Sequence, residues 1–217
     1  EYYRQCSYAL DTLDTAAQKA AGGTDKPQGM LRVTMPLWFA NGLFSSWLVE
    51  YRERYPEVTL DLVLDNRHID LIAEGFDLAL RVSKTPNPSL IVKPLAVIQF
   101  VLVASPEYIR QHGKPTTLEE VGKHQAILPS YTNQRNVEIT HTASGEKATL
   151  SLKPVMLTDN TLMVRELVKT GGGIGYQPLL VVQKDLEDGS LVRLLPEYTM
   201  INEQLNAAYV DRAFLSA

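Results

Sequence analysis

Three short segments decide the fold predicted from this sequence: Leu31-Arg-Val-Thr34, Val58-Thr-Leu-Asp-Leu-Val-Leu64 and Asp77-Leu-Ala-Leu-Arg-Val82. Each is rich in aliphatic residues and bounded by turn-forming ones, which is typical of β-strands. A short helix is predicted at Ile69 to Glu74. A longer one, with Pro36 able to occupy its first turn, is predicted at Trp38–Tyr55 from residues at helical spacing: Ala40, Leu43, Phe44, Trp47, Leu48 and Tyr51. Alternating strands and helices require a mainly parallel sheet with right-handed crossovers.

The rest of the chain continues this alternation and predicts a second lobe. The apolar run Leu90–Ser105 is too long for one strand, so two strands are expected there. A hairpin is predicted around Ser144-Gly145, from Val137–Thr142 and Lys147–Leu152. The other predicted elements are helices at Pro106–His112, Leu118–His124, Asn160–Thr170 and Leu179–Glu187, and strands at Gln125–Leu128, Ile174–Gln177, Leu191–Leu194 and Leu205–Val210. The last strand could return to the first sheet.

The predicted fold class is therefore α/β, with two Rossmann-like lobes around a cleft. Such folds place ligands at the carboxyl ends of strands and the amino ends of helices. The Pro36 and Asp159 turns are expected to offer free N–H groups to a small molecule.

Composition narrows the class of protein further. The chain is 45% apolar and 21% charged, as soluble globular proteins are, and has no apolar run of the roughly 18–20 residues that cross a bilayer. Cys6 stands alone, so no internal disulfide forms, which fits the cytoplasm. The net charge is −4 and no basic stripe is present, so this chain alone is not expected to bind duplex DNA. It opens at Glu1 without a methionine or an export signal, and we expect a piece of a longer protein.

The first 21 residues form a predicted helix, which Gly22-Gly23 ends. Apolar or small residues follow the 3-4 spacing of a coiled-coil seam: Tyr3, Cys6, Leu10, Leu13, Ala17 and Ala20. Spacing alone equally allows an ordinary amphipathic helix that lies on its own domain.

No motif in the chain assembles a catalytic, metal or cofactor site. Gly171-Gly-Gly-Ile-Gly175 follows a helix and precedes a strand, the reverse of a phosphate-binding loop, so helix capping and close packing are expected. Ser105 and Thr158-Asp159-Asn160 precede helices and are interpreted as caps. The histidines are scattered without metal-ligand spacing: His68, His112, His124 and His141.

Several segments, in order and spacing, resemble the LysR-type transcription regulators. They are Gly29–Pro36, Tyr55–Leu62, Asp70–Arg81, Leu102–Tyr108, Gly172–Pro178 and Leu186–Pro196. The resemblance implies a type II periplasmic-binding-protein-like effector domain after a linker helix, with the helix-turn-helix head and the family's last helix absent from this chain. It favours the coiled-coil interpretation of Glu1–Ala21. The implied parts are a linker helix and hinge at 1–27, lobe I at 28–98, lobe II at 99–198 and a return to lobe I at 199–217.

The resemblance also implies that a small-molecule effector binds between the lobes. The residues carried over to its site are Met35, Pro36, Leu37, Trp38, Asn66, Val82, Ser83, Ser130, Tyr131, Thr158, Asp159, Tyr176 and Gln177. Trp38 would narrow the pocket or stack on a flat effector. Asp159 would repel an acid or bind an amine, and the ligand's charge stays open.

Relatives of this family are homodimers, and the resemblance implies the same assembly here, or a tetramer when the linker helix is included. The antiparallel interface would join two helices through Phe44, Trp47, Leu48, Tyr51, Leu162, Met163 and Leu167. The surplus of apolar residues on both helices fits a second buried face, and the alternative is that these residues are simply core.

Two other classes of function remain possible at this stage. A solute-binding protein for transport shares the two-lobed fold, although it has no use for the heptad helix. An enzyme would need a catalytic constellation, which the sequence lacks. We expect a non-enzymatic, cytoplasmic regulator that contacts DNA only through a segment outside this chain.

Overall fold

The computed structural model describes residues 27–67, 69–82, 90–131, 135–200 and 203–209. The predicted helix Glu1–Ala21, Cys6 and Ser83 lie outside these residues. The described chain divides into two compact units. Unit 1 runs to Leu95 and resumes at Leu205, and unit 2 is Ala96–Gln204.

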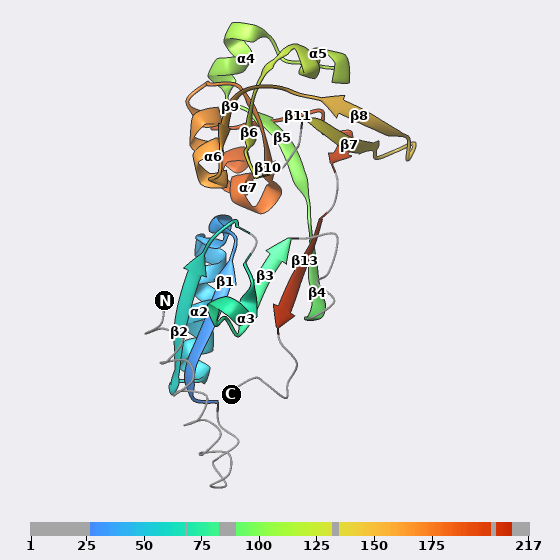
Figure 1. The fold of residues 1–217 in the computed structure, drawn as a ribbon. Coiled ribbons are helices and arrows are strands. Elements are labelled where there is room, and N and C mark those ends of the chain that lie inside the picture. Colours follow the sequence, from blue (N-terminus) through green and yellow to red (C-terminus); the bar gives the residue numbers. More distant parts are fainter. Residues whose placement is uncertain (1–26, 68, 83–89, 132–134, 201–202, 210–217) are drawn as a thin grey trace, which may run out of the picture. The chain divides into compact units, whose positions relative to one another are not determined.

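Unit 1 is built on a five-stranded sheet of order β2-β1-β3-β13-β4 (Figure 1). β1 pairs in parallel with both β2 and β3, as the alternating pattern predicted. The last strand pairs antiparallel with β3, which confirms that the chain returns to the first sheet. The bounds are β1 (Gly29–Met35), β2 (Val58–Leu64), β3 (Leu78–Val82), β4 (Ile91–Ile98) and β13 (Glu203–Tyr209).

The helix after β1 starts later than predicted. A separate 3-10 turn, η1 (Leu37–Phe39), follows Pro36, and α2 (Gly42–Arg54) begins only after Asn41. The Asn41 side chain accepts a hydrogen bond from the backbone N–H of Phe44, 3.0 Å away. An asparagine cap of this kind fixes a helix start, so the prediction that Pro36 occupies the first turn of this helix is wrong.

The two faces of this sheet are covered differently. The short helix α3 (Leu71–Glu74) packs through Leu71 and its neighbours on the face that carries Ala79 and Ala208. α2 lies over the opposite face, beside Leu60 and Leu62 of β2. No α2 side chain is buried, and three of its apolar residues are more than half exposed: Leu43 (60%), Trp47 (56%) and Val49 (59%).

Unit 2 is built on a second five-stranded sheet of order β11-β5-β10-β6-β9, and a smaller sheet of order β12-β7-β8. The two strands predicted within Leu90–Ser105 are confirmed as β4 and β5, and the hairpin as β7 and β8. β9 and β12 were not predicted. The bounds are β5 (Phe100–Ala104), β6 (Gln125–Pro129), β7 (Asn136–His141), β8 (Lys147–Ser151), β9 (Lys153–Thr158), β10 (Ile174–Pro178), β11 (Val192–Leu194) and β12 (Tyr198–Met200).

Helices cover both faces of the larger sheet in unit 2 (Figure 1). Leu102 and Ala104 of β5 face one apolar cluster with α4 and α5, while Val101 and Val103 face another with α6 and α7. A strand buried on both faces has to be apolar throughout, as β5 is. The helices are α4 (Pro106–His112), α5 (Leu118–Lys123), α6 (Thr161–Lys169) and α7 (Leu179–Glu187).

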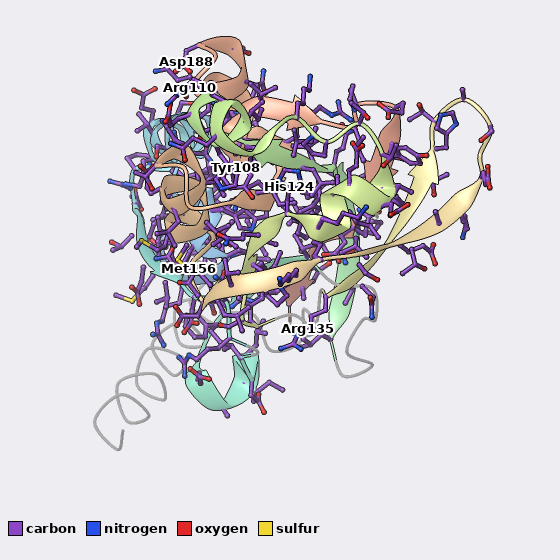
Figure 2. All side chains as sticks on the ribbon, turned by 90° about the horizontal axis from the view of Figure 1, so that it is seen from above. Tyr108, Arg110, His124, Arg135, Met156 and Asp188 are labelled. Atoms are coloured by element: carbon purple, nitrogen blue, oxygen red, sulfur yellow. The ribbon has the colours of Figure 1, made fainter. Side chains whose placement is uncertain are left out.

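A buried tyrosine joins α4 to the start of β6. The Tyr108 hydroxyl accepts a hydrogen bond from the backbone N–H of Gln125 and lies 3.2 Å from Nδ1 of His124, beside it in Figure 2. The ring of His112 stacks on Tyr108 with centroids 4.3 Å apart. These two histidines therefore pack against Tyr108 at the ends of α4 and α5.

The glycine-rich turn between α6 and β10 confirms the capping and packing interpretation. Gly171 has φ +87°, a left-handed conformation that ends the helix at little cost only in glycine. A Cβ at Gly175 would lie 2.5 Å from Cγ2 of Val168 on α6. The glycine thus lets the helix approach the strand closely.

α6 and α7 are clamped together by the buried carboxylate of Asp185. Its oxygens lie 2.5 and 2.6 Å from nitrogens of Arg165 and 2.8 Å from Nζ of Lys169. Burial raises the pKa of Asp185, but the hydrogen bonds and charges of these two partners outweigh burial and hold that pKa below its usual value.

We expect Gly175→Ala to lower the free energy of unfolding by about 1–3 kcal/mol, because the added methyl group forces Val168 out of position. Gly42→Ala is the matched control, since nothing lies within 4 Å of a Cβ there and φ is not left-handed. Urea titration followed by circular dichroism measures both variants. Equal stability of the two would contradict the close-packing role.

We expect Asp185→Asn to cost about 2–4 kcal/mol at pH 7, because it leaves two partly buried cations without their carboxylate. A carboxyl group with a lowered pKa stabilises the fold above its unfolded pKa of about 3.9 and loses that effect as the pH falls. The difference between wild type and variant should therefore shrink towards pH 3. Asp188→Asn, at an exposed residue just past α7, should change stability little at either pH.

Candidate functional site

Parallel strands bring the residues that follow them to one edge of each sheet, and the candidate site residues of each unit lie there. In unit 1 these are the residues after β1, β2 and β3. Met35 and Pro36 are buried, and Trp38 is 5% exposed with its ring stacked on Phe39 at 4.4 Å. The part of this edge that follows β1 is therefore apolar and aromatic.

A hydrogen bond ties the segment after β1 to the segment after β2. The backbone N–H of Leu37 donates to Oδ1 of Asn66 across 3.2 Å, and the N–H of Asp65 donates to the carbonyl of Met35 across 2.8 Å. Asp65 in turn holds Arg67, whose Nε lies 2.6 Å from a carboxylate oxygen. Burial raises the pKa of Asp65, while the hydrogen bonds and charges of Arg67 and Arg81 bring it below its usual value.

A guanidinium lies near the end of β3 at the same edge. Nη2 of Arg81 donates to Oγ1 of Thr34 across 2.7 Å, and Nη1 donates to the carbonyl of Leu80 across 3.0 Å. Burial lowers the pKa of Arg81, and the charge of Asp65 offsets this only in part. The unit 1 edge thus combines apolar, amide and cationic groups.

The corresponding edge of unit 2 is lined by hydroxyl groups. The N–H of Ser130 donates to the carbonyl of Thr158 across 2.8 Å, which joins the ends of β6 and β9. The hydroxyl of Tyr131 lies 2.7 Å from that of Thr161, the buried first residue of α6. Asp159, which directly follows Thr158 in the sequence, is exposed.

Gln177 has an unusual environment at the end of β10. Its side chain is 0% exposed, and neither its amide nitrogen nor its amide oxygen has a hydrogen-bond partner in the described protein. Its neighbour Tyr176 points to the other face of the strand and stacks on Phe100 in the core cluster, with centroids 4.8 Å apart.

The structure thus brings together Leu37 with Asn66, and Ser130 with Thr158. Val82 ends β3 and pairs with Leu205 of β13. The expectation of free N–H groups is wrong at three positions, because Asn66 occupies the N–H of Leu37 and the side chain of Asn160 occupies those of Leu162 and Met163.

Sequence reasoning missed Thr34, Arg81 and Thr161 as members of these edges. A signal for Arg81 was present, since it is the one charged residue in the otherwise apolar strand Leu78–Val82. Thr34 and Thr161 gave no comparable signal, because their burial depends on the strands and helices packed around them.

Within the described residues, no group of three or more His, Cys, Asp or Glu side chains is arranged to hold a metal ion. In the same part of the chain, no helix combines the length and apolarity that crossing a membrane requires.

Comparison with known proteins identifies the fold and the family. Residues 24–217 match the model of the LysR substrate binding domain. The chain belongs to the LysR substrate-binding domain family. The regulatory domain of CrgA from Neisseria meningitidis, described as a LysR-type transcriptional regulator, is 30% identical with a TM-score of 0.75, over 85% of this chain and 90% of that one. The LysR-type fold is the two-lobed, type II periplasmic-binding-protein-like one.

Longer regulators of this family share the same region. LtrA of Klebsiella pneumoniae, a probable HTH-type transcriptional regulator, is 29% identical over 92% of this LysR-family chain and 64% of its own length. DmlR of Escherichia coli is 30% identical over 88% of this chain and 62% of its own. The full-length virulence activator AphB of Vibrio cholerae superposes with a TM-score of 0.76 and 26% identity over 97% of this chain and 71% of that one. This chain therefore spans less than two thirds of the length of LtrA and of DmlR.

Proposed function

We propose that this chain is the effector-sensing and self-assembling region of a bacterial LysR-type regulator that binds DNA through a helix-turn-helix outside this chain. The observation that carries the proposal is the match of residues 24–217 to the LysR substrate binding domain. Related chains of this family are named as HTH-type transcriptional regulators. Such a protein works on DNA, so we place it in the bacterial cytoplasm.

The proposed effector-binding residues are those at the carboxyl edges of the two sheets. Met35, Trp38 and Asn66 supply apolar and amide groups in unit 1, and Ser130 and Thr158 supply hydroxyls in unit 2. A mostly apolar surface with a few fixed polar groups is typical of small-molecule sites. Pro36, Leu37, Val82, Ser83, Tyr131, Asp159, Tyr176 and Gln177 complete the proposed set.

The competing functions have less support. A solute-binding protein for transport shares the fold, but the similar proteins named above are regulators of transcription. No enzyme is among the similar proteins named above.

Effector binding is testable with Trp38. A thermal-shift screen of aromatic acids, amino acids and other metabolites should find a ligand that raises the melting temperature, since ligands that bind the native state stabilise it. Trp38→Phe, which keeps an aromatic ring against Phe39, should weaken that ligand about tenfold, or about 1.4 kcal/mol, by calorimetry. Trp38→Ala should weaken it further and lower stability, because Trp38 is buried.

Trp47→Phe is the matched control, because Trp47 lies on α2 and is 56% exposed. Its effector affinity should equal that of the wild type. An effector that binds all three variants with unchanged affinity would place its site away from Trp38.

We propose self-association through one surface on each unit. The first comprises α2 and the edge strand β2, with exposed Leu43, Trp47 and Val49, and an open groove of about 620 Å³ beside Val49 lies between the two elements. The second comprises α6 and the edge strand β9, with exposed Val155, Leu157 and Met163. Exposed apolar side chains gathered on one surface favour a protein interface. The predicted interface residues Phe44, Leu48, Tyr51, Leu162 and Leu167 are half-buried beside these.

An antiparallel dimer would join the α2 surface of one protomer to the α6 surface of its partner, in two equivalent contacts. The segment Glu1–Ala21 would supply a separate contact and build a tetramer in the intact regulator.

Trp47→Glu should convert the dimer to a monomer in multi-angle light scattering, because it places a charge at the centre of the α2 surface. Ile72→Glu is the matched control: Ile72 is 63% exposed but lies on α3, on the other face of the unit 1 sheet. Its variant should stay dimeric. A wild-type chain that is monomeric at high concentration would contradict the proposed interface.

A further inference from the structure

Arg81 is a half-buried cation whose two identified side-chain hydrogen bonds are to neutral groups. They go to the hydroxyl of Thr34 at 2.7 Å and to the carbonyl of Leu80 at 3.0 Å. Thr34 is itself fully buried, so the guanidinium is fixed against the end of β1. Among the described residues, no carboxylate lies within 4 Å of Arg81.

Three carboxylates of unit 1, among them Asp65, whose charge acts on Arg81, already have hydrogen-bond partners. The carboxylate of Asp65 accepts hydrogen bonds from Nε of Arg67 at 2.6 Å and from the backbone N–H of Arg67 at 2.8 Å. Asp77 accepts the backbone N–H of Arg32, and Asp70 caps α3 through Ile72 and Ala73. Each of these carboxylates therefore already stabilises another part of unit 1.

This edge therefore holds a guanidinium, Arg81, that forms no ion pair with any described residue, although the net charge of the chain is −4. Arg81 lies in the field of Asp65, which already engages Arg67, while Arg67 also lies in the field of Glu74. Removing a cation from water without pairing it costs several kcal/mol, and burial accordingly lowers the pKa of Arg81. A cationic effector would raise this cost, a neutral one would leave it, and an anionic one would offset it.

We infer that Arg81 receives a carboxylate of the effector, held at the carboxyl edge of the unit 1 sheet beside Thr34. The inference rests on the proposed function and adds the chemical class of the ligand. A guanidinium fork matches a planar carboxylate with two parallel hydrogen bonds, and two of its donors remain anchored on Thr34 and Leu80. Anchoring orients the remaining donors before the ligand arrives, which lowers the entropy lost on binding.

A purely structural role for Arg81 makes a different prediction. If the guanidinium only pins β3 to β1 through Thr34, its removal lowers stability and leaves ligand affinity unchanged. If it anchors a carboxylate, its removal relieves an unpaired buried charge. Arg81→Met, which keeps the apolar stem, should then melt no lower than the wild type.

The experiment compares matched acids and amides on the full chain. The probes are benzoate, phenylacetate, succinate and glutarate with the corresponding amides, measured by thermal shift and calorimetry at pH 7. At least one carboxylate should raise the melting temperature while its amide does not. Arg81→Met should weaken that carboxylate at least tenfold. Arg81→Lys, which keeps the charge and loses the fork, should weaken it by a smaller factor.

Arg110→Met is the control for loss of a positive charge elsewhere, because Arg110 is an exposed residue of α4 paired with Glu107 (Figure 2). It should bind the carboxylate as the wild type does. Carboxylate affinity that survives in Arg81→Met, or a panel in which no carboxylate binds, overturns the inference. A neutral effector found in the broader metabolite screen, with its affinity reduced by Trp38→Phe, would overturn this inference alone and leave the proposed sensing function standing.

Discussion

The antiparallel pairing of β13 with β3 holds unit 1 together. β13 reaches its place only after the chain has completed all of unit 2, and it sets Leu205 against Val82 and Tyr209 against Leu78. It also lies between β3 and β4 in the sheet, so β4 has no neighbour without it. Closing so long a loop costs entropy, which grows only slowly with loop length, and the paired strand and its apolar contacts offset that cost. Ala208 belongs to the same apolar cluster as Ala79 and Leu71.

This pairing also fixes the end of β3, where Arg81 lies. β3 pairs with β1 up to Ala79 and with β13 through Arg81 itself, whose partner is Asn206, so the backbone of Arg81 is held and its side chain has a defined direction. The parallel register of β1 with β2 and β3 then gathers Leu37, Asn66 and Arg81 at one edge, although they are far apart in sequence. The edge carries polar groups beside the apolar residues that follow β1, because the strands end there, while the apolar cluster around Leu71 occupies a face of the sheet.

Both units keep polar groups that a sheet built only for stability would not contain. Arg81 lacks an ion-pair partner among the described residues, and the buried amide of Gln177 has no hydrogen bond there. Each unsatisfied buried group costs about 1–3 kcal/mol. By contrast, the buried carboxylate of Asp185 is fully paired by Arg165 and Lys169 and joins two helices. Costly groups at the carboxyl edges and satisfied ones elsewhere fit binding at the edges.

The sequence by itself determined the order of the elements and the α/β class. Apolar strands such as β5 and capped helices such as α4 carry their signals locally, in the run Phe100–Ala104 and in Ser105-Pro106. The glycines before β10 likewise predicted the end of a helix from the local sequence alone. Only the tertiary structure decided that the edge strand β9 exists and which acids pair with which bases across the chain. These outcomes depend on contacts between distant segments: β9 pairs with β6, and Arg165 and Lys169 of one helix contact Asp185 of another.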